Sequence, residues 1–320
     1  MASENPTDKA MEPQIVQWFV DTRPLWPVAK SNAREEVQQL KIVAAEALSL
    51  LTEAEQTSVL KYYHLKDAKM SLVSHLLKHL IIAKCGVPWS RTILSRNEKK
   101  KPVFKPESVD SHVLLDFNVS HQAGIVSLIA AVGFNDVTVG TDIVCVNERI
   151  QQDSEHISKH GFGNWVDIHA DVLADSEVAA IKLTPINEET RRSGTVIEKQ
   201  LRKFYAVWCL REAYVKMTGD ALLAPWLKEL EILLVNPPNA KEGLDATSLE
   251  QGDRIRQFAN YFQKKVVMDV TMELTPIGKH YMIAGSIHVP EELKDERAKL
   301  GKWQRLDFEK DVLAFAVAPS

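Results

Sequence analysis

One long helical stretch stands out in the pattern of apolar and polar positions. Thr195 followed by Glu198 is typical of a capping box, apolar residues then recur at every third or fourth position, and Gly219 supplies a stop. The pattern therefore predicts a long helix that begins at Thr195 and ends before Gly219.

The middle of this helix presents two charged groups beside an aromatic ring. Trp208, Glu212 and Lys216 are four residues apart, so they lie on one face. A Glu–Lys pair at this spacing is commonly a surface ion pair worth about 0.2 to 0.5 kcal/mol. The alternative is that both residues belong to a functional site, and two other segments that carry polar side chains, 117–122 and 139–144, support this alternative.

The first half of the chain predicts helices followed by a small sheet. A strand is expected at Ile15 to Asp21 and helix from about Arg34. A capping box at Thr52 opens a helix that includes Tyr62 and Tyr63. A further helix carries an apolar face formed by Leu72, Leu76, Leu77, Leu80 and Ile81. The strands expected after it are Arg91 to Leu94, Val103 to Phe104, Val113 to Val119, Ile125 to Val132 and Val137 to Val144.

The second half repeats this order loosely. Helical pattern is expected from Glu148 to Leu183, a polar linker or insertion from Ile186 to Gly194, the long helix, and strands at Leu230 to Val235, Lys265 to Leu274 and His280 to Val289. In the tail we expect a charged helix around Glu291 to Leu300 and an apolar end at Val312 to Val317. The expected organisation is an N-terminal half (1–138), a C-terminal half (139–290), and an extension (291–320) that docks on the N-terminal half.

Composition narrows the class of protein. The 320 residues are 45% hydrophobic and 26% charged with a formal net charge of −4, as in a soluble globular protein without a global basic field. Nucleic-acid binding is therefore not expected, and the absence of long apolar runs and of a signal sequence predicts a cytoplasmic protein without a membrane span. The three cysteines form no CxxC pair and are expected to be buried thiols.

Asp142 follows Gly140 near the end of an apolar, β-branched run. Its carboxylate either caps the next turn near Asn147 or belongs to a site, since glycine in a strand allows another backbone or a ligand to approach closely. Together with Glu212 it would suit Mg²⁺, which uses few protein carboxylates and completes its coordination with water and phosphate oxygens. A phosphate-containing substrate is then implied.

Ser120 and His121 end a predicted strand. Adjacent strand residues point to opposite faces, so the two do not form a catalytic pair. His121 is either structural or donates a hydrogen bond to an anion, and Gln122 offers an amide oxygen.

A local basic cluster interrupts an otherwise acidic chain. It consists of Arg96, Lys99, Lys100 and Lys101, is followed by Pro102, and is joined in the predicted fold by Lys66 and Lys69. Such a run is commonly a solvated turn or a targeting patch. The alternative is that these cations, with Mg²⁺, neutralise a ligand that carries several phosphates.

Taken together, these segments resemble the 4′-phosphopantetheinyl transferases, in the large monomeric surfactin-type class. The resemblance is carried, in the family's order, by Tyr62-Tyr63-His64 with Lys66-Asp67-Ala68, Lys101-Pro102, Phe117 to His121, Gly140 to Ile143, and Trp208 to Lys216. The resemblance implies an α+β fold of two similar α/β halves related by a pseudo-two-fold, with coenzyme A in the cleft between them. It also implies that phosphopantetheine is transferred to a serine of acyl or peptidyl carrier domains, with adenosine 3′,5′-bisphosphate released.

The resemblance assigns roles residue by residue. Asp142 and Glu212 look like ligands of Mg²⁺, with Mn²⁺ as a substitute, and Lys216 like the pyrophosphate contact; these three form the expected catalytic group. The expected coenzyme A contacts are Lys66, Lys69, Arg96, Lys100, Lys101, Pro102, Ser120, His121 and Lys216.

Two positions depart from the family pattern. Val144 stands where bacterial members often carry a third acidic residue, so water or Gln122 would complete the metal site, as in the eukaryote-like branch. Lys100 replaces the glycine usual before the Lys-Pro pair, which changes the expected turn. A binding module for carrier proteins that performs no chemistry is the alternative function.

Overall fold

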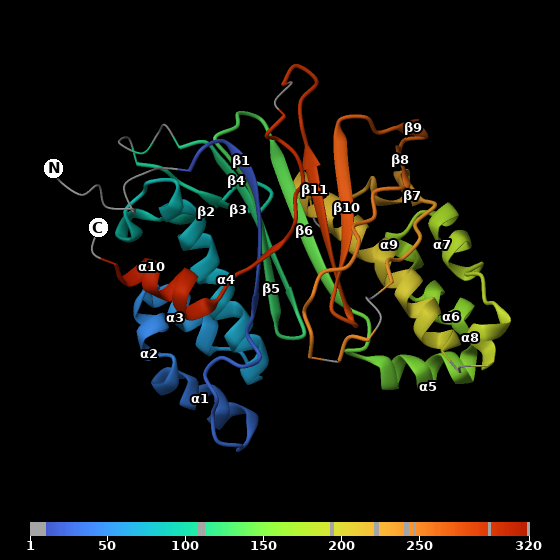
Figure 1. The fold of residues 1–320 in the computed structure, drawn as a ribbon, viewed down its shortest axis with the longest axis horizontal. Helices are drawn as coiled ribbons and strands as arrows, with labels where there is room; N and C mark the ends of the chain where they lie inside the picture. The colour runs from blue at the N-terminus through green and yellow to red at the C-terminus, as the bar shows by residue number, and fades with distance from the viewer. Residues whose placement is uncertain are drawn as a thin grey trace. The chain divides into compact units, whose positions relative to one another are not determined.

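The computed structural model describes residues 11–107, 110, 113–192, 195–220, 224–239, 243–245, 247–293 and 296–318. The chain divides into two compact units, Met1–Val139 with Pro290–Ser320, and Gly140–Val289. Each unit combines helices with antiparallel strands, so the mixed α and β content expected from the sequence is present (Figure 1). The polar N-terminal residues 1–10 lie outside the described part of the chain.

The first unit is built on a four-stranded sheet. Its order is β12 (Gln304–Arg305), β1 (Gln14–Asp21), β5 (Ile125–Val132) and β4 (Leu115–Gln122). β5 is antiparallel to both neighbours, whereas β12 is parallel to β1. Helix α4 (Leu65–Lys84) packs on β4 and β5 (Figure 1), and its predicted apolar face, Leu72 to Ile81, is fully buried.

Shorter elements surround α4. They are α1 (Ala33–Val43), α2 (Ala45–Ser49), α3 (Glu53–Leu60), the 3₁₀ turn η1 (Trp89–Arg91), β2 (Leu94–Arg96) and β3 (Pro102–Phe104). The capping box of α3 is confirmed, because the Thr52 hydroxyl accepts from the Glu55 N–H and the Glu55 carboxylate accepts from the Thr52 N–H.

Two predictions in this region were wrong. Helix α3 ends at Leu60, so it does not include Tyr62 and Tyr63, which are 37% and 67% exposed and offer no buried face to continue it. The expected strand at Arg91 to Leu94 is instead the end of η1 followed by β2.

The C-terminal segment packs on the first unit's core. A π-helical turn, η5 (Phe308–Leu313), places Phe308 and Val312 in that core, and α10 (Ala314–Val317) follows. The helix expected near Glu291 to Leu300 is absent from the described residues of that stretch. Ala298 and Leu300 are buried two positions apart, a spacing that extended backbone satisfies and a helix does not.

The second unit combines a three-stranded sheet with a long helix. β10 (Val270–Ile277), β11 (Tyr281–His288) and β6 (Thr138–Cys145), which begins at the boundary, lie in that order, and α9 (Val196–Thr218) packs on β10 and β11 (Figure 1). A smaller sheet contains β7 (Leu230–Leu233), β8 (Ala259–Phe262) and β9 (Lys265–Val266). The remaining helical elements are α5 (Ile150–His160), α6 (Phe162–Asp167), η3 (Ala170–Val172), α7 (Asp175–Lys182), α8 (Glu188–Arg192) and η4 (Leu227–Glu229).

The long helix α9 has the predicted bounds. It ends at Gly219, whose φ of 77° is left-handed and whose N–H donates to the Lys216 carbonyl. At the other end the Thr195 side chain does not make the expected capping bond, so that detail was wrong. The expected insertion contains the short helix α8, while Gly194 lies outside the described residues.

The strand predicted at Lys265 to Leu274 is in fact two strands. β9 ends at Val266 and β10 begins at Val270, because Gln263 and Lys264, with φ of 51° and 62°, form a tight turn that pairs β9 with β8. Met268 lies between the two strands and is 86% exposed, which also indicates that the strand is interrupted there. In the described part of the chain, every helix is too short or too polar to cross a membrane.

Gly140 allows the backbone of α9 to approach that of β6. A Cβ at this position would lie 2.1 Å from the Ala213 carbonyl oxygen and 2.4 Å from the Met217 nitrogen. Of the two readings of Gly140 from sequence, close approach of another backbone is the one that the structure shows. The distance between β6 and α9 is therefore set by the absence of a side chain.

We expect Gly140→Ala to reduce the free energy of unfolding by about 3 kcal/mol, because α9 must shift away from β6. Gly163→Ala is the matched control, since a Cβ there meets nothing closer than the Lys182 side chain at 3.9 Å. Denaturant unfolding of both variants measures the difference. Equal stability of the two would contradict the packing constraint.

Candidate active site

In the second unit, Asp142 and Lys216 form an ion pair between β6 and α9. The Lys216 Nζ lies 2.6 Å from Asp142 Oδ1, and the two side chains are 28% and 9% exposed. The surface pair between Glu212 and Lys216, which helical spacing alone favours, is not formed. Lys216 instead pairs with the strand that Gly140 holds close to the helix.

Glu212 lies one helical turn before Lys216 and has an orphaned oxygen. Its Oε1 is buried and has no hydrogen-bond partner. Burial raises the pKa of Glu212, the Lys216 charge lowers it, the Asp142 charge raises it and Arg211 lowers it, and together these effects bring it to about 7. An unsatisfied buried carboxylate next to a second carboxylate is suited to accept a cation or a proton.

Lys216 remains a cation in this environment. Burial alone would lower its pKa, but the neighbouring Asp142 and Glu212 carboxylates raise it above the ordinary value for lysine. The group therefore presents two carboxylates and one ammonium, with the ammonium available to an anionic ligand as a fixed positive charge.

The residues fit a magnesium ion. Mg²⁺ is commonly held by one or two carboxylates, with water and substrate phosphate supplying the rest of its octahedron. Asp142 and the orphaned Glu212 oxygen provide such a pair, and among the described residues no set of three or more His, Cys, Asp or Glu side chains forms a closed metal cage. Gln122, the expected third ligand, lies on β4 in the first unit.

Arg211 anchors the helix that carries Glu212. Its fully buried guanidinium donates to the carbonyls of Val172, Leu227 and Leu230 and lies 3.4 Å from the Glu177 carboxylate. Sequence reasoning missed this role, because a charged residue in a helix predicts exposure.

Aromatic stacking secures the same helix. The Trp208 ring stacks on Phe204 at a centroid distance of 5.7 Å, which supports an architectural role for the tryptophan. Cys209, fully buried, directs its thiol to the Asp142 carbonyl at 3.3 Å.

In the first unit, the basic cluster forms the turn between β2 and β3. Lys100 adopts a φ of 64°, the left-handed conformation that the family's glycine would favour, so the lysine keeps the turn at a cost of about 1 kcal/mol. Arg96 is exposed and donates to the Lys100 carbonyl at 2.7 Å. Pro102 begins β3 opposite Arg96.

Lys101 points inward from this turn. Its Nζ lies 2.7 Å from Asp116 Oδ2 and 3.2 Å from the Val139 carbonyl oxygen, and its side chain is 5% exposed. Asp116 also accepts from the Val139 N–H at 2.8 Å. Asp116 was not anticipated, although an acidic residue in an apolar strand was a usable signal. A phosphate contact from Lys101 would have to use the third ammonium hydrogen.

The other expected contacts are distributed over the first unit. Lys66 is exposed at the start of α4, whereas Lys69 is buried and donates to the Leu25 carbonyl, and burial lowers its pKa. On β4, Ser120 is buried and His121 is exposed, so the two face opposite sides as predicted.

Comparison with known proteins identifies the class. A family model described as the N-terminal part of 4′-phosphopantetheinyl transferase matches residues 40–133, and one described as the 4′-phosphopantetheinyl transferase superfamily matches residues 138–263. The chain belongs to this family of enzymes.

Three similar proteins are all from eukaryotes. Over 95% of this chain and 95% of the relative, it is 42% identical to 4′-phosphopantetheinyl transferase 1 of Fusarium mangiferae. It is 34% identical to the transferase NpgA of Emericella nidulans, over 88% of this chain and 84% of that protein. The human L-aminoadipate-semialdehyde dehydrogenase-phosphopantetheinyl transferase is 24% identical over 77% of this chain and 69% of its own. The chain therefore lies in the eukaryote-like branch.

The raised pKa of Glu212 predicts a pH-dependent stability. Between its ordinary value of 4.5 and about 7 the folded protein holds a proton that the unfolded chain has lost, so this residue lowers stability progressively as pH rises through that window. In chelator, we expect Glu212→Gln to exceed the parent in free energy of unfolding by about 1 to 3 kcal/mol above pH 7, with a small difference near pH 4.5. Denaturant unfolding across this range measures it.

The control for this experiment is Glu155→Gln, an exposed carboxylate on α5. It should follow the parent at every pH. A Glu212→Gln profile parallel to that of the parent would show that Glu212 is not perturbed in the folded state.

Proposed function

We propose that this chain transfers 4′-phosphopantetheine from coenzyme A to a serine hydroxyl of a carrier protein, with release of adenosine 3′,5′-bisphosphate and with a requirement for magnesium. The observation that carries the proposal is the buried, unpartnered oxygen of Glu212 beside the Asp142–Lys216 ion pair. Membership of the family supplies the reaction class, and the carboxylates and the lysine supply groups suited to a pyrophosphate.

In the proposed reaction the serine oxygen forms a bond to the β-phosphorus of coenzyme A. The bond from that phosphorus to the bridging oxygen breaks, and the bisphosphate leaves with the electron pair. Asp142 and Glu212 would hold Mg²⁺, which when bound would stabilise negative charge on the pyrophosphate oxygens. Lys216 donates hydrogen bonds to the same oxygens as their charge increases.

Glu212 has a second possible task in this scheme. A carboxylate with a raised pKa is a competent base, so it takes the serine proton directly or through a water molecule. A divalent cation bound to Glu212 lowers the basicity of its carboxylate. The direct route and the route through water therefore differ in how much the bound cation weakens the base.

The first unit would bind the nucleotide end of coenzyme A. We assign Arg96, Lys66, Ser120 and His121 to the 3′-phosphate nucleotide, with Lys101 contributing its third hydrogen. Lys69 and Lys100 add positive charge to the same field, and Pro102 rigidifies the turn.

Each unit has a strand, then helices that end in a long helix, then an antiparallel hairpin whose second strand pairs with the first strand: β1, α4 and β4–β5 in one, and β6, α9 and β10–β11 in the other. This shared order supports a pseudo-two-fold relation between the two halves. For the metal site we propose that Gln122 or water completes the coordination and that Mn²⁺ can replace Mg²⁺.

The partners are inferred from the family. We propose acyl and peptidyl carrier domains of polyketide, nonribosomal-peptide, fatty-acid or aminoadipate reductase enzymes as acceptors, and a monomeric enzyme. The name of the human relative refers to an L-aminoadipate-semialdehyde dehydrogenase.

The first test is the intact mass of an apo carrier protein incubated with the chain and coenzyme A, in Mg²⁺ or in excess chelator. We expect the mass to increase by one phosphopantetheine only with the metal. Asp142→Ala and Glu212→Gln should each lower turnover by about 100-fold or more, since a metal ion contributes several kcal/mol to transition-state stabilisation. Glu155→Gln should retain full activity.

Near-normal turnover in either site variant would overturn the metal assignment. Coenzyme A binding without any mass change, across several types of carrier, would favour the noncatalytic binding module instead.

Arg96→Ala tests the nucleotide site. We expect it to raise KM for coenzyme A about 10-fold with little change in kcat, because a charge-assisted contact to phosphate would be lost. Lys105→Ala, an exposed cation one residue beyond β3, should leave KM unchanged. Equal KM values for the two variants would place Arg96 outside the nucleotide site.

A further inference from the structure

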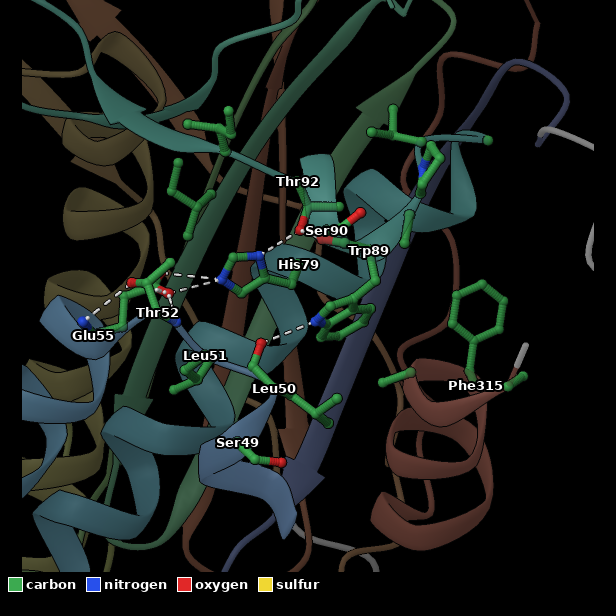
Figure 2. Close-up of a pocket in the computed structure, with 18 of the residues that line it drawn as sticks. Ser49, Leu50, Leu51, Thr52, Glu55, His79, Trp89, Ser90, Thr92 and Phe315 are labelled. Atoms are coloured by element: carbon green, nitrogen blue, oxygen red, sulfur yellow. Dashed lines mark hydrogen bonds and ion pairs between the residues drawn. The ribbon is translucent and has the colours of Figure 1, made fainter. Parts of the chain in front are cut away.

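A polar network lies in a largely apolar pocket of the first unit. The pocket has a volume of about 910 Å³ and is lined from α3, α4, η1 and the C-terminal helix, with Trp89 and Phe315 among its apolar walls (Figure 2). Figure 2 shows His79 between Glu55 and Thr92. The hydrogen bonds of this network are made within the protein, which indicates a structural role for these side chains.

The first step concerns the hydroxyl of Thr92. Its Oγ1 lies 2.6 Å from the Trp89 carbonyl oxygen, which can only accept, so the single hydroxyl hydrogen is used there. His79 Nδ1 lies 2.7 Å from the same Oγ1. The hydroxyl must accept in this second bond, and Nδ1 therefore carries a hydrogen.

The second step concerns the other ring nitrogen. His79 Nε2 lies 3.0 Å and 3.2 Å from the two carboxylate oxygens of Glu55. Burial alone would raise the pKa of Glu55, but hydrogen bonds from His75, His79 and Thr52 hold it well below its usual range. An ionised carboxylate only accepts, so Nε2 also carries a hydrogen and His79 is an imidazolium, although its side chain is only 6% exposed.

The third step connects this pair to the basic turn. Thr92 lies in the short segment that joins η1 to β2, and Trp89, the first residue of η1, donates through Nε1 to the Leu50 carbonyl at 3.0 Å. Lys78, on α4, has a pKa lowered to about 8 by burial, and the charge of Glu55 raises it while that of Arg96 lowers it. The charges of Glu55 and Arg96 therefore both act on Lys78.

The charged groups that act on Glu55 or on Lys78 come from three elements. They are Glu55 on α3, His75, Lys78 and His79 on α4, and Arg96 on β2. Glu55 is the carboxylate of this set, and its charge acts on His79 and Lys78. Its removal would take away the negative charge that these two side chains share.

We propose that Glu55 and a doubly protonated His79 are positioning residues that hold the segment from Trp89 to Arg96 against α4 and thereby place Arg96 for coenzyme A. The placement of Arg96 for coenzyme A rests on the proposed function, whereas the charge state of His79 does not. The pair acts through the backbone between Thr92 and Arg96, four residues apart.

The charge state is tested by ¹⁵N NMR of the histidine rings in the full chain, with His79→Gln to assign the signals. We expect both ring nitrogens of His79 to be protonated at neutral pH, and Glu55→Gln to convert it to the neutral ring. A single protonated nitrogen at pH 7 in the parent would overturn the proposal. This measurement needs no enzymatic activity.

The positioning role is tested by steady-state kinetics of Thr92→Val, which removes the acceptor of His79 Nδ1 with little change in shape. We expect KM for coenzyme A to rise about 3- to 10-fold while kcat stays within 2-fold. Thr92→Ser should restore the parent value, and Thr57→Val, at an exposed position on α3, should not differ from it.

The comparison of KM with kcat separates positioning from general loosening of the fold, because loosening would lower kcat as well as raise KM. An imidazolium with an unchanged KM in Thr92→Val would overturn the positioning role. If the parent fails to modify any carrier, coenzyme A affinity measured by calorimetry replaces KM, so failure of the transfer reaction and failure of this proposal are distinguished.

Discussion

The close approach of a strand and a helix at Gly140 determines the geometry of the second unit. Because no side chain separates β6 from α9, the Ala213 carbonyl and the Met217 nitrogen occupy the space where a Cβ would lie. This contact allows Lys216 to reach Asp142 across the interface and to leave Glu212 without the partner that helical spacing would have provided. The close approach at Gly140 thus accompanies an ion pair between Lys216 and Asp142 in place of a surface pair between Lys216 and Glu212.

The charged cluster of Asp142, Glu212 and Lys216 lowers the stability of the folded protein. A buried carboxylate with an unsatisfied oxygen is costly to retain, and the surrounding structure compensates with contacts that hold α9 rigidly. Arg211 binds three carbonyls from neighbouring segments, and Trp208 stacks on Phe204. These contacts hold α9 in its position, although burial of its own charged residues opposes that position.

Local rules predicted the elements of this fold well where one periodic signal dominates. The capping box at Thr52, the bounds of α9 and the strand at Ile125 to Val132 all follow from spacing and turn chemistry. The same rules failed where burial in the folded protein decides the local structure. Tyr62 and Tyr63 match a helical pattern but face solvent, and Ala298 and Leu300 are buried with the alternation of a strand. The charged site residues were visible in the sequence, but the pairing of Lys101 with Asp116, of Arg211 with Glu177 and of His79 with Glu55 was not, because long-range pairing leaves no local pattern.

The three cysteines are all buried, and this has a chemical consequence. Burial raises the pKa of Cys85 to about 12 and of Cys145 to about 11, and that of Cys209 well above its usual range. Thiols held in the protonated form are poor nucleophiles and do not take part readily in disulfide exchange. An enzyme that uses coenzyme A, as proposed for this chain, can therefore meet the oxidised forms of that thiol without forming a mixed disulfide with them.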